Sequence, residues 1–273
     1  MRQNQFFTLT LTITCLFLFS ILIFFYWKPK QQHQIQSHKK NVLSIKHLGL
    51  IMDGNRRWAK KRSLIPWQGH KEGVEPVKRA VEFCVENDIP YLSLYAFSTE
   101  NFKRSTEELN HLFGIIKEGL SDKDFNKLLS HGVKIKFIGE RSLFPPDLIA
   151  KINETEQQTK NGDKLTLLIL FCYGGRQELT ASCREIARKV SAGHLKPEAI
   201  TPELIEEHLW TAGIPSPDLV VRTGGEKRLS NFYPWQSTYS ELLFLDKYWP
   251  DITKEDLAHI VRTFENRKRN FGK

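Results

Sequence analysis

Short apolar runs alternate with longer amphipathic stretches from residue 47 to the end of the chain. Runs of four to eight mostly apolar residues bounded by Gly, Pro, Asn or Asp are typical of buried strands. Such runs predict strands at residues 47–52, 91–97, 133–138, 165–171, 218–222 and 241–245. The run at 165–171 is apolar at nearly every position, which favours a parallel sheet covered on both faces.

Between these runs, apolar residues recur at helical spacing, as in the valines from Val74 to Val85. Ser105 with Glu108 three residues later forms a capping-box pattern, which predicts the start of another helix. The pattern predicts helices at residues 72–87, 105–130, 146–160, 177–191, 202–210 and 254–269. Strands that alternate with helices predict an α/β fold with a mostly parallel central sheet flanked by helices.

Residues 6–27 form a different pattern, a run of 22 residues without a charged side chain. At about 1.5 Å per residue, a helix of this length spans the roughly 30 Å hydrocarbon core of a bilayer. Tyr26 and Trp27 end the run and lysines follow, which favours a cytoplasmic body. We therefore expect a single-pass anchor at residues 1–27, a polar basic tether at 28–45 and one globular domain at 46–273. A cleaved secretory signal is the alternative, but no cleavage motif follows the run.

The net charge of +9 on the 273 residues is unevenly placed. Residues 1–46 hold six cations and no acid, so the other 227 residues carry only +3, and the body does not have the charge of a nucleic-acid binder. The four cysteines have no C-x-x-C spacing, which disfavours a zinc knuckle or a disulfide framework. The P-loop, dinucleotide-binding and nucleophile-elbow motifs are also absent.

Polar residues gather where the predicted strands end, which in a parallel sheet is a single edge. Asp53 follows the first strand, residues 98–104 follow the second, and residues 222–226 follow the fifth. Near these ends lie the arginines Arg56, Arg57, Arg104, Arg222 and Arg228. Arginines beside glycine-rich turns bind phosphate groups, although each residue alone could simply cap a helix or form a turn.

The sequence allows two interpretations for each of Asp53, His70 and Glu241. Asp53 is either a Mg²⁺ ligand or the side chain of an Asx turn. His70 is either a phosphate donor or a polar residue at a helix start. Glu241 would supply a second carboxylate, but a polar residue at a strand end is common.

Several motifs together resemble the cis-prenyltransferase family of isoprenyl transferases. They are MDGNRRWA at 52–59, GHKEG at 69–73, YAFSTENF at 95–102 with Arg104, YGGR at 173–176, RTGGE at 222–226, RLSNF at 228–232, YSEL at 239–242 and WPD at 249–251. The order and spacing match over residues 46–272.

The resemblance implies a Mg²⁺-dependent enzyme, usually a homodimer, that adds isopentenyl diphosphate to an allylic diphosphate such as farnesyl diphosphate. It implies that the product is a long-chain Z-polyprenyl diphosphate lipid carrier. Asp53 and Asn101 would be catalytic, and Asp53 with Glu241 of a partner subunit would hold the metal. The substrate-binding residues implied are Gly54, Asn55, Arg56, Arg57, Trp58, His70, Ser98, Thr99, Glu100, Phe102, Arg104, Arg222, Arg228 and Ser230. Of these, His70 and the residues near Gly54 would hold the allylic diphosphate, and Arg222, Arg228 and Ser230 would hold isopentenyl diphosphate.

Three positions depart from the family pattern. Pro66 stands where an arginine is usual, so one allylic phosphate contact is either lost or supplied by Lys61 or Arg62. Cys172 replaces an asparagine, and Lys227 stands where some members have a histidine. Two other functions remain open, namely a non-catalytic partner subunit and a membrane-tethered protein that binds anionic ligands. The retained Asp53 and arginines disfavour the first, and the nearly balanced charge of the body disfavours the second.

Overall fold

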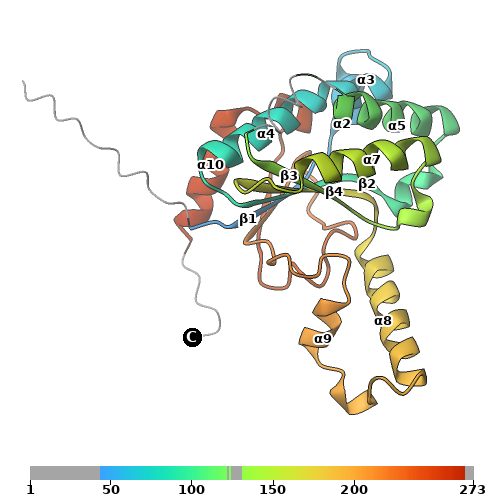
Figure 1. Cartoon of the computed structure of the whole chain (residues 1–273). Helices are drawn as coiled ribbons and strands as arrows, with labels where there is room; N and C mark the ends of the chain where they lie inside the picture. Colours follow the sequence, from blue (N-terminus) through green and yellow to red (C-terminus); the bar gives the residue numbers. More distant parts are fainter. Residues whose placement is uncertain (1–43, 122, 124–130, 268–273) are drawn as a thin grey trace, which may run out of the picture. The chain divides into compact units, whose positions relative to one another are not determined.

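The chain forms a six-stranded sheet with the strand order β3-β4-β2-β1-β5-β6 in this computed structural model (Figure 1). The structure describes residues 44–121, 123 and 131–267. The strands are β1 (His47–Ile51), β2 (Tyr91–Ser98), β3 (Val133–Ile138), β4 (Leu165–Tyr173), β5 (Leu219–Arg222) and β6 (Glu241–Phe244). Every neighbouring pair is parallel, so all six strands end at the same edge. The predicted α/β fold with a parallel sheet is confirmed.

Four long helices cover one face of the sheet (Figure 1). They are α4 (Val74–Glu86), α5 (Thr106–Ser121), α7 (Pro146–Thr159) and α10 (Lys254–Glu265). Their apolar sides pack with alternate strand residues such as Leu92 and Leu167, which are fully buried. Because alternate residues of a strand point to opposite faces, this core uses half of each strand.

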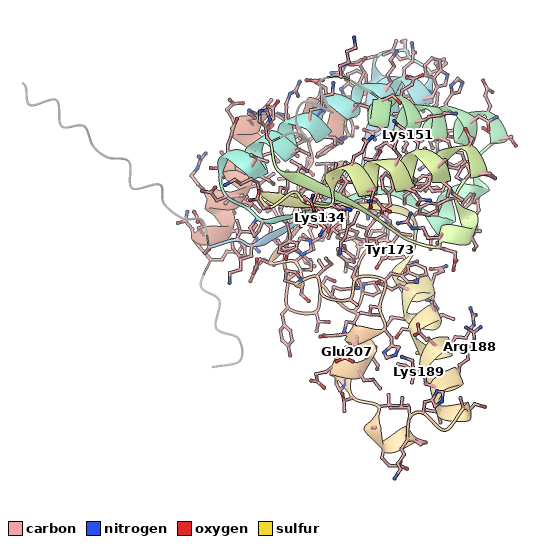
Figure 2. The ribbon with its side chains drawn as sticks, in the orientation of Figure 1. Lys134, Lys151, Tyr173, Arg188, Lys189 and Glu207 are labelled. Carbon is pink, nitrogen blue, oxygen red and sulfur yellow. The ribbon has the colours of Figure 1, made fainter. Side chains whose placement is uncertain are left out.

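A loop covers much of the other face. Phe232 and Tyr233, from the segment between β5 and β6, pack against Leu168 and Val220 there. Two more helices, α8 (Gly175–Ser191) and α9 (Pro202–Glu207), extend away from this face (Figure 1). Figure 2 shows Tyr173 near the base of this arm, where its hydroxyl donates to the buried Glu178. The flanking helices that the sequence predicts are therefore confirmed, although a loop replaces them over part of one face.

Two short helices, α2 (Asn55–Lys61) and α3 (Pro66–Glu72), were not predicted. They pack so closely that a Cβ at Gly69 would lie 2.0 Å from the carbonyl oxygen of Asn55, so glycine is needed at this position. The 3₁₀ turns are Thr99–Lys103, Arg141–Leu143, Pro197–Ala199 and Trp249–Asp251. The predicted extension of α5 to residue 130 falls almost wholly outside the described residues. The helix α10 ends at Glu265, with Asn266 as its C-cap, so it is shorter than the predicted helix to residue 269. Residues 208–210 lie beyond the end of α9, which is shorter than predicted.

No helix among the described residues is long and apolar enough to cross a bilayer. The predicted anchor at residues 1–27 and nearly all of the predicted tether lie outside the described part of the chain. The described residues belong to one compact unit, Val42–Lys273. The anchor, the tether and the domain boundary at residue 46 stay predictions.

Candidate active site

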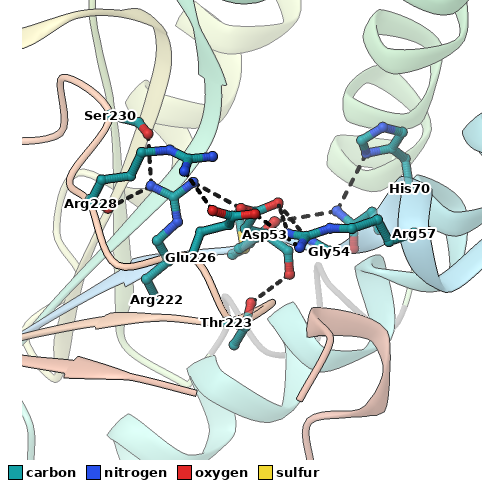
Figure 3. Close-up of polar contacts among 11 residues, drawn as sticks. Asp53, Gly54, Arg57, His70, Arg222, Thr223, Glu226, Arg228 and Ser230 are labelled. Carbon is teal, nitrogen blue, oxygen red and sulfur yellow. Dashed lines mark hydrogen bonds and ion pairs between the residues drawn. The ribbon is translucent and has the colours of Figure 1, made fainter. Parts of the chain in front are cut away.

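Asp53 lies at the carboxyl edge of the sheet, two residues beyond the end of β1, and its carboxylate has three donors (Figure 3). The Nη2 atom of Arg222 lies 2.8 Å from Oδ2, the Nη2 atom of Arg57 lies 3.2 Å from Oδ1, and the Gly54 amide donates to Oδ1 at 2.6 Å. Burial alone raises the pKa of Asp53, but the hydrogen bond and charge of Arg222 and the charge of Arg57 outweigh it and lower the pKa. The carboxylate is therefore ionised at neutral pH.

Arg222 ends β5 and is 5% exposed. Its Nη1 atom donates to the carbonyl oxygen of Arg228 at 2.5 Å and to the hydroxyl of Ser230 at 2.7 Å. These contacts fold the 228–231 loop over the guanidinium, with Ser230 and Asn231 at positive φ. The Nε atom of Arg222 has no hydrogen-bond partner among the described residues, which leaves one buried donor for a ligand.

The backbone of the turn that carries Asp53 is held from three sides. The Thr223 hydroxyl donates to the carbonyl oxygen of Asp53 at 2.7 Å, and the Trp249 amide donates to the same oxygen at 3.1 Å. Gly54 has φ +106, and a Cβ there would lie 2.6 Å from Cδ1 of Tyr248. Glycine therefore satisfies both the left-handed backbone and the close contact with Tyr248.

His70 of α3 is a neutral group at the centre of a second cluster. Its Nδ1 atom lies 3.4 Å from Nδ2 of Asn55, and its Nε2 atom lies 3.5 Å from Nη1 of Arg104 and 3.6 Å from Oε1 of Glu108. Burial, with the charges of Arg104 and Arg56, lowers the pKa of His70 to about 4. An incoming anion would favour its protonated form, because the anion would offset the neighbouring arginines.

Glu226 forms ion pairs with both Arg57 and Arg228. Its Oε1 atom lies 3.3 Å from Nη1 of Arg57, and its Oε2 atom is paired with Arg228 at 2.5 Å (Figure 3). Arg57 thus contacts both Asp53 and Glu226. A cavity of about 580 Å³ opens here, lined by Met52, Asp53, Gly54, Asn55, Arg56, Arg57, Lys60, Leu64, Pro66, His70, Arg104, Glu226 and Arg228. Because most of its charged lining is cationic, this cavity suits a polyanion.

A second, larger cavity of about 960 Å³ adjoins the first, since Asp53, His70 and Arg228 line both. Its polar end also includes Ser98, Glu100, Asn101, Arg104, Arg176, Arg222, Ser230 and Asn231. Its other end runs between the sheet and the helices α4 and α5, where it is lined by Val77, Leu94, Ala96, Phe97, Leu112, Ile116, Gly119, Leu120, Phe137 and Ile169. The site therefore combines anion-binding groups with a deep apolar space.

The structure brings most of the predicted site residues to these two cavities. Thr99 and Phe102 do not line either one, and Phe102 packs on Phe97 with 5.0 Å between ring centroids. Trp58 is also outside both linings, because its indole N–H donates to Asp251 and its ring lies under Arg62. The functions predicted for these three residues remain predictions.

Glu241 lies at the opposite edge of the sheet from Asp53. It begins β6 opposite Leu219, the first residue of β5, and its carboxylate pairs with Nη1 of Arg267 at 2.6 Å. Within one chain, Asp53 and Glu241 therefore do not form a joint metal site. The expectation that Glu241 reaches the metal from a partner subunit stays a prediction.

The departures from the family pattern have clear structural positions. Pro66 lines the cationic cavity, but neither suggested substitute does, since Arg62 stacks on Trp58 and Lys61 lies over the ring of Tyr248. Lys60 lines that cavity instead.

Cys172 is buried with φ +50, and its thiol lies 3.6 Å from the carbonyl oxygen of Leu143. Lys227 is exposed beside Glu226.

Sequence reasoning missed several residues that build the site. Glu226, Arg176 and Asn231 stand inside the RTGGE, YGGR and RLSNF motifs, so their position gave a signal. Tyr248 and Glu108 gave no signal of a role at the site, because their contacts there join segments far apart in the sequence. Glu108, for example, lies 3.6 Å from His70 of α3.

The donor set fits Mg²⁺ only with help from a ligand. Among the described residues, no three His, Cys, Asp or Glu side chains are grouped so that they could hold a metal. Asp53 alone offers an ionised carboxylate at the junction of the two cavities, and Mg²⁺ bound with phosphates usually takes only one or two carboxylates. Asp53 is therefore the residue that would hold the ion together with a diphosphate.

A cationic cavity joined to a deep apolar one is typical of a class of protein that binds a diphosphate carrying a long apolar chain. The sequence comparison agrees, because residues 51–272 match the family described as "Putative undecaprenyl diphosphate synthase". The chain belongs to this family of prenyl-transferring enzymes.

Individual relatives support the same assignment. The chain is 42% identical over 228 residues to a Pseudomonas putida undecaprenyl-diphosphate synthase named as farnesyl-diphosphate specific, with 84% of this chain and 90% of the relative covered. It is 41% identical over 244 residues to a Pyrococcus horikoshii synthase named as geranylgeranyl-diphosphate specific, with 89% and 92% covered. Among solved structures, lavandulyl diphosphate synthase from Lavandula x intermedia in complex with dimethylallyl diphosphate is similar, with a TM-score of 0.81, 33% identity and 84% and 98% covered.

Proposed function

We propose that this protein is a Mg²⁺-dependent cis-prenyltransferase that elongates an allylic diphosphate, farnesyl diphosphate first among the candidates, with isopentenyl diphosphate. The observation that carries the proposal is the ionised Asp53 between two arginine clusters at the mouth of a cavity of about 960 Å³. Two diphosphates need two cationic positions, and a growing prenyl chain needs an apolar space. Both cationic positions lie at the carboxyl edge of the sheet, and the apolar space runs from there between the sheet and the helices α4 and α5.

In this reaction the bond between C1 of the allylic substrate and its diphosphate oxygen breaks. The C4 atom of isopentenyl diphosphate forms a bond to C1, a proton leaves C2, and a new Z double bond forms. Bound Mg²⁺ would neutralise the negative charge that develops on the leaving diphosphate. The chain's own groups bind and orient the two substrates, which lowers the entropic part of the barrier.

We assign the two arginine clusters to the two substrates. Arg57, His70 and the amides after Asp53 line the cationic cavity and would hold the allylic diphosphate. Arg222, Arg228 and Ser230 form the second cluster and would hold isopentenyl diphosphate. Asn101 lines the larger cavity, but its Oδ1 atom accepts from the Ser98 amide at 3.0 Å, so it shapes the 98–104 turn in this conformation.

The family resemblance further supports a homodimer in which Glu241 of the partner subunit approaches the metal, and the apolar run at 6–27 supports a single-pass anchor with a cytoplasmic body. The expected product is a long-chain Z-polyprenyl diphosphate, a lipid that partitions into bilayers. An anchored enzyme would release it beside its destination.

The test is an elongation assay on the full chain in detergent. Mg²⁺, labelled isopentenyl diphosphate and either farnesyl or geranylgeranyl diphosphate are supplied, and the dephosphorylated products are separated by reversed-phase chromatography. A ladder that ends at a defined long polyprenol supports the proposal and identifies the preferred allylic substrate. A folded, magnesium-supplied protein that makes no product from either substrate contradicts it and favours the non-catalytic partner subunit.

A further inference from the structure

Residues 60–66, from the last two residues of α2 to the first residue of α3, are seven consecutive exposed residues with the sequence KKRSLIP. Two of them are large and apolar, since Leu64 is 37% exposed and Ile65 is 51% exposed. Single exposed apolar residues are common on protein surfaces and need no explanation. Here two such residues are adjacent in the chain, and their surroundings suggest what covers them.

The surroundings are cationic. Residues 54–71 contain six lysines and arginines and no acidic residue. Four of these cations have acidic or aromatic partners. Arg56 lies 3.7 Å from Glu108, and Arg57 lies between Asp53 and Glu226. Arg62 lies 3.2 Å from Asp251, and Lys61 lies over the ring of Tyr248. Lys60 has no ion pair with any described residue, and the apolar Leu64 and Ile65 follow four and five positions later in the chain. An apolar tip with adjacent cations matches the interface of an anionic bilayer, with acyl chains below negative headgroups.

The backbone fixes this tip in its exposed position. The Leu64 amide donates to the carbonyl oxygen of Ala59 at 3.0 Å, and the Ile65 amide donates to Oε1 of Gln68 at 3.1 Å. Ser63 turns the chain with φ +55. Because α3 packs closely on α2 at Gly69, both ends of the segment that carries the two apolar residues are held in place.

The tip lies at the mouth of the candidate active site, since Leu64 and Pro66 line the cationic cavity. This step rests on the proposed function, in which the molecules that enter and leave the site carry prenyl chains. The predicted tether of residues 28–45 reaches about 60 Å when fully extended, so it does not prevent this face from meeting the membrane that holds the anchor.

We propose that the 60–66 segment docks on an anionic phospholipid surface, with Leu64 and Ile65 inserted at the boundary between headgroups and acyl chains. This contact would orient the mouth of the site toward the lipid. A second copy of the chain is the competing occupant, but facing cationic segments would repel each other. This contact is made by residues 60–66 and is separate from the predicted N-terminal anchor.

The test places a polarity-sensitive fluorophore on the loop of the full chain. Cys15 and Cys183 are replaced by Ser, and the label is attached to Ser63→Cys, which keeps Leu64 and Ile65. The matched control is a label at Ser191→Cys, because Ser191 is exposed beside the cations Arg188 and Lys189 but has no comparable apolar tip. The protein is reconstituted in vesicles of phosphatidylcholine with or without phosphatidylglycerol, and quenching by spin-labelled lipid is measured.

We expect strong lipid quenching at position 63 only in the anionic vesicles, and weak quenching at position 191 in both. Replacing Leu64 and Ile65 with Ser, or Lys60 and Lys61 with Glu, should lower the quenching at position 63 by roughly tenfold. Equal quenching at positions 63 and 191 in anionic vesicles would overturn the proposal. A spectral change at position 63 that rises with protein concentration without vesicles would also overturn it, in favour of a second copy. Neither readout needs catalysis, so failure here is distinct from failure of the proposed enzyme activity.

Discussion

Asp53 and Arg222 lie 2.8 Å apart, and their ion pair joins the ends of β1 and β5 at the carboxyl edge of the sheet. The register explains the contact, because Ile51 is opposite Arg222 and the chain turns back at Asp53. Arg222 is almost fully buried, whereas the side chain of Asp53 is 29% exposed. The pair therefore presents its carboxylate to the cavity and keeps its guanidinium behind it.

The first prediction concerns the charge of Asp53. Asp53→Asn keeps the shape but removes the negative charge, so we expect turnover to fall by about 10²–10³ or more. The measurement is the elongation rate at saturating Mg²⁺, with folding checked by circular dichroism. Asp147→Asn is the control, because Asp147 also pairs with a cation but lies on an exposed surface. A rate within a few fold of the parent would contradict the assignment.

The second prediction concerns His70, whose pKa is lowered to about 4 mainly by burial. The unfolded chain holds this proton up to about pH 6.5, so folding releases it between pH 6.5 and 4. The stability that neutral His70 contributes is complete above pH 6.5 and is lost as pH falls toward 4, by up to about 3 kcal/mol. Urea unfolding at several pH values should show a steeper loss in the parent than in His70→Asn. The same dependence of the unfolding free energy on pH in the parent and in His70→Asn would contradict this prediction.

The same group reports on anion binding. Inorganic pyrophosphate in the cationic cavity should raise the pKa of His70, because it offsets the charges of Arg104 and Arg56. The ring signals of His70 in an NMR titration, assigned with His70→Asn, would show the shift. A pKa that is unchanged at saturating pyrophosphate would place the anion elsewhere.

The sequence alone predicts much of this fold for a simple reason. The strands β1 to β5 are short apolar runs between helices, and their parallel pairing brings Asp53 and Arg222 to one edge, as expected. The helices α2 and α3 could not be predicted from periodicity, because residues 55–61 are mostly charged and form a helix through packing around Ala59 and Gly69. Tyr248 packs against Gly54 although the two residues lie far apart in the sequence, so no local pattern predicts this contact.

The third prediction concerns Gly54. Gly54→Ala should lower the free energy of unfolding by about 1–3 kcal/mol and impair catalysis, because the residue has φ +106 and a Cβ would meet Tyr248. Gly193→Ala is the control, since Gly193 has φ +73 and its Cβ would meet no described atom within 4 Å. The difference between the two variants measures the steric part. Adding Tyr248→Ala to Gly54→Ala should restore part of that difference, and no restoration would mean that backbone strain dominates.

The fourth prediction tests the proposed partner contribution of Glu241. Glu241→Gln should raise the Mg²⁺ concentration for half-maximal activity by about tenfold or more if the carboxylate approaches the metal. Arg267→Ala breaks the same ion pair from the other side and should leave the Mg²⁺ requirement unchanged. Equal effects in both variants would make Glu241 structural. Mixing Asp53→Asn chains with Glu241→Gln chains should restore activity, since one mixed dimer site would then have both carboxylates.

The last prediction concerns the length of the product. Gly119 of α5 lines the apolar end of the larger cavity, and a Cβ there would meet no described atom within 4 Å. Gly119→Leu should therefore place a side chain in the cavity and end elongation earlier, which reversed-phase chromatography would show as shorter polyprenols.

Gly114→Leu is the matched control for this change. Gly114 lies on the same helix with similarly open surroundings among the described residues, but it does not line the cavity. Both substitutions replace glycine in a helix, so both should raise helix stability by a similar amount, about 1 kcal/mol. Only Gly119→Leu should shorten the product, because only its side chain competes with the growing chain for space. Identical product ladders from the two variants would show that the prenyl chain does not reach this end of the cavity.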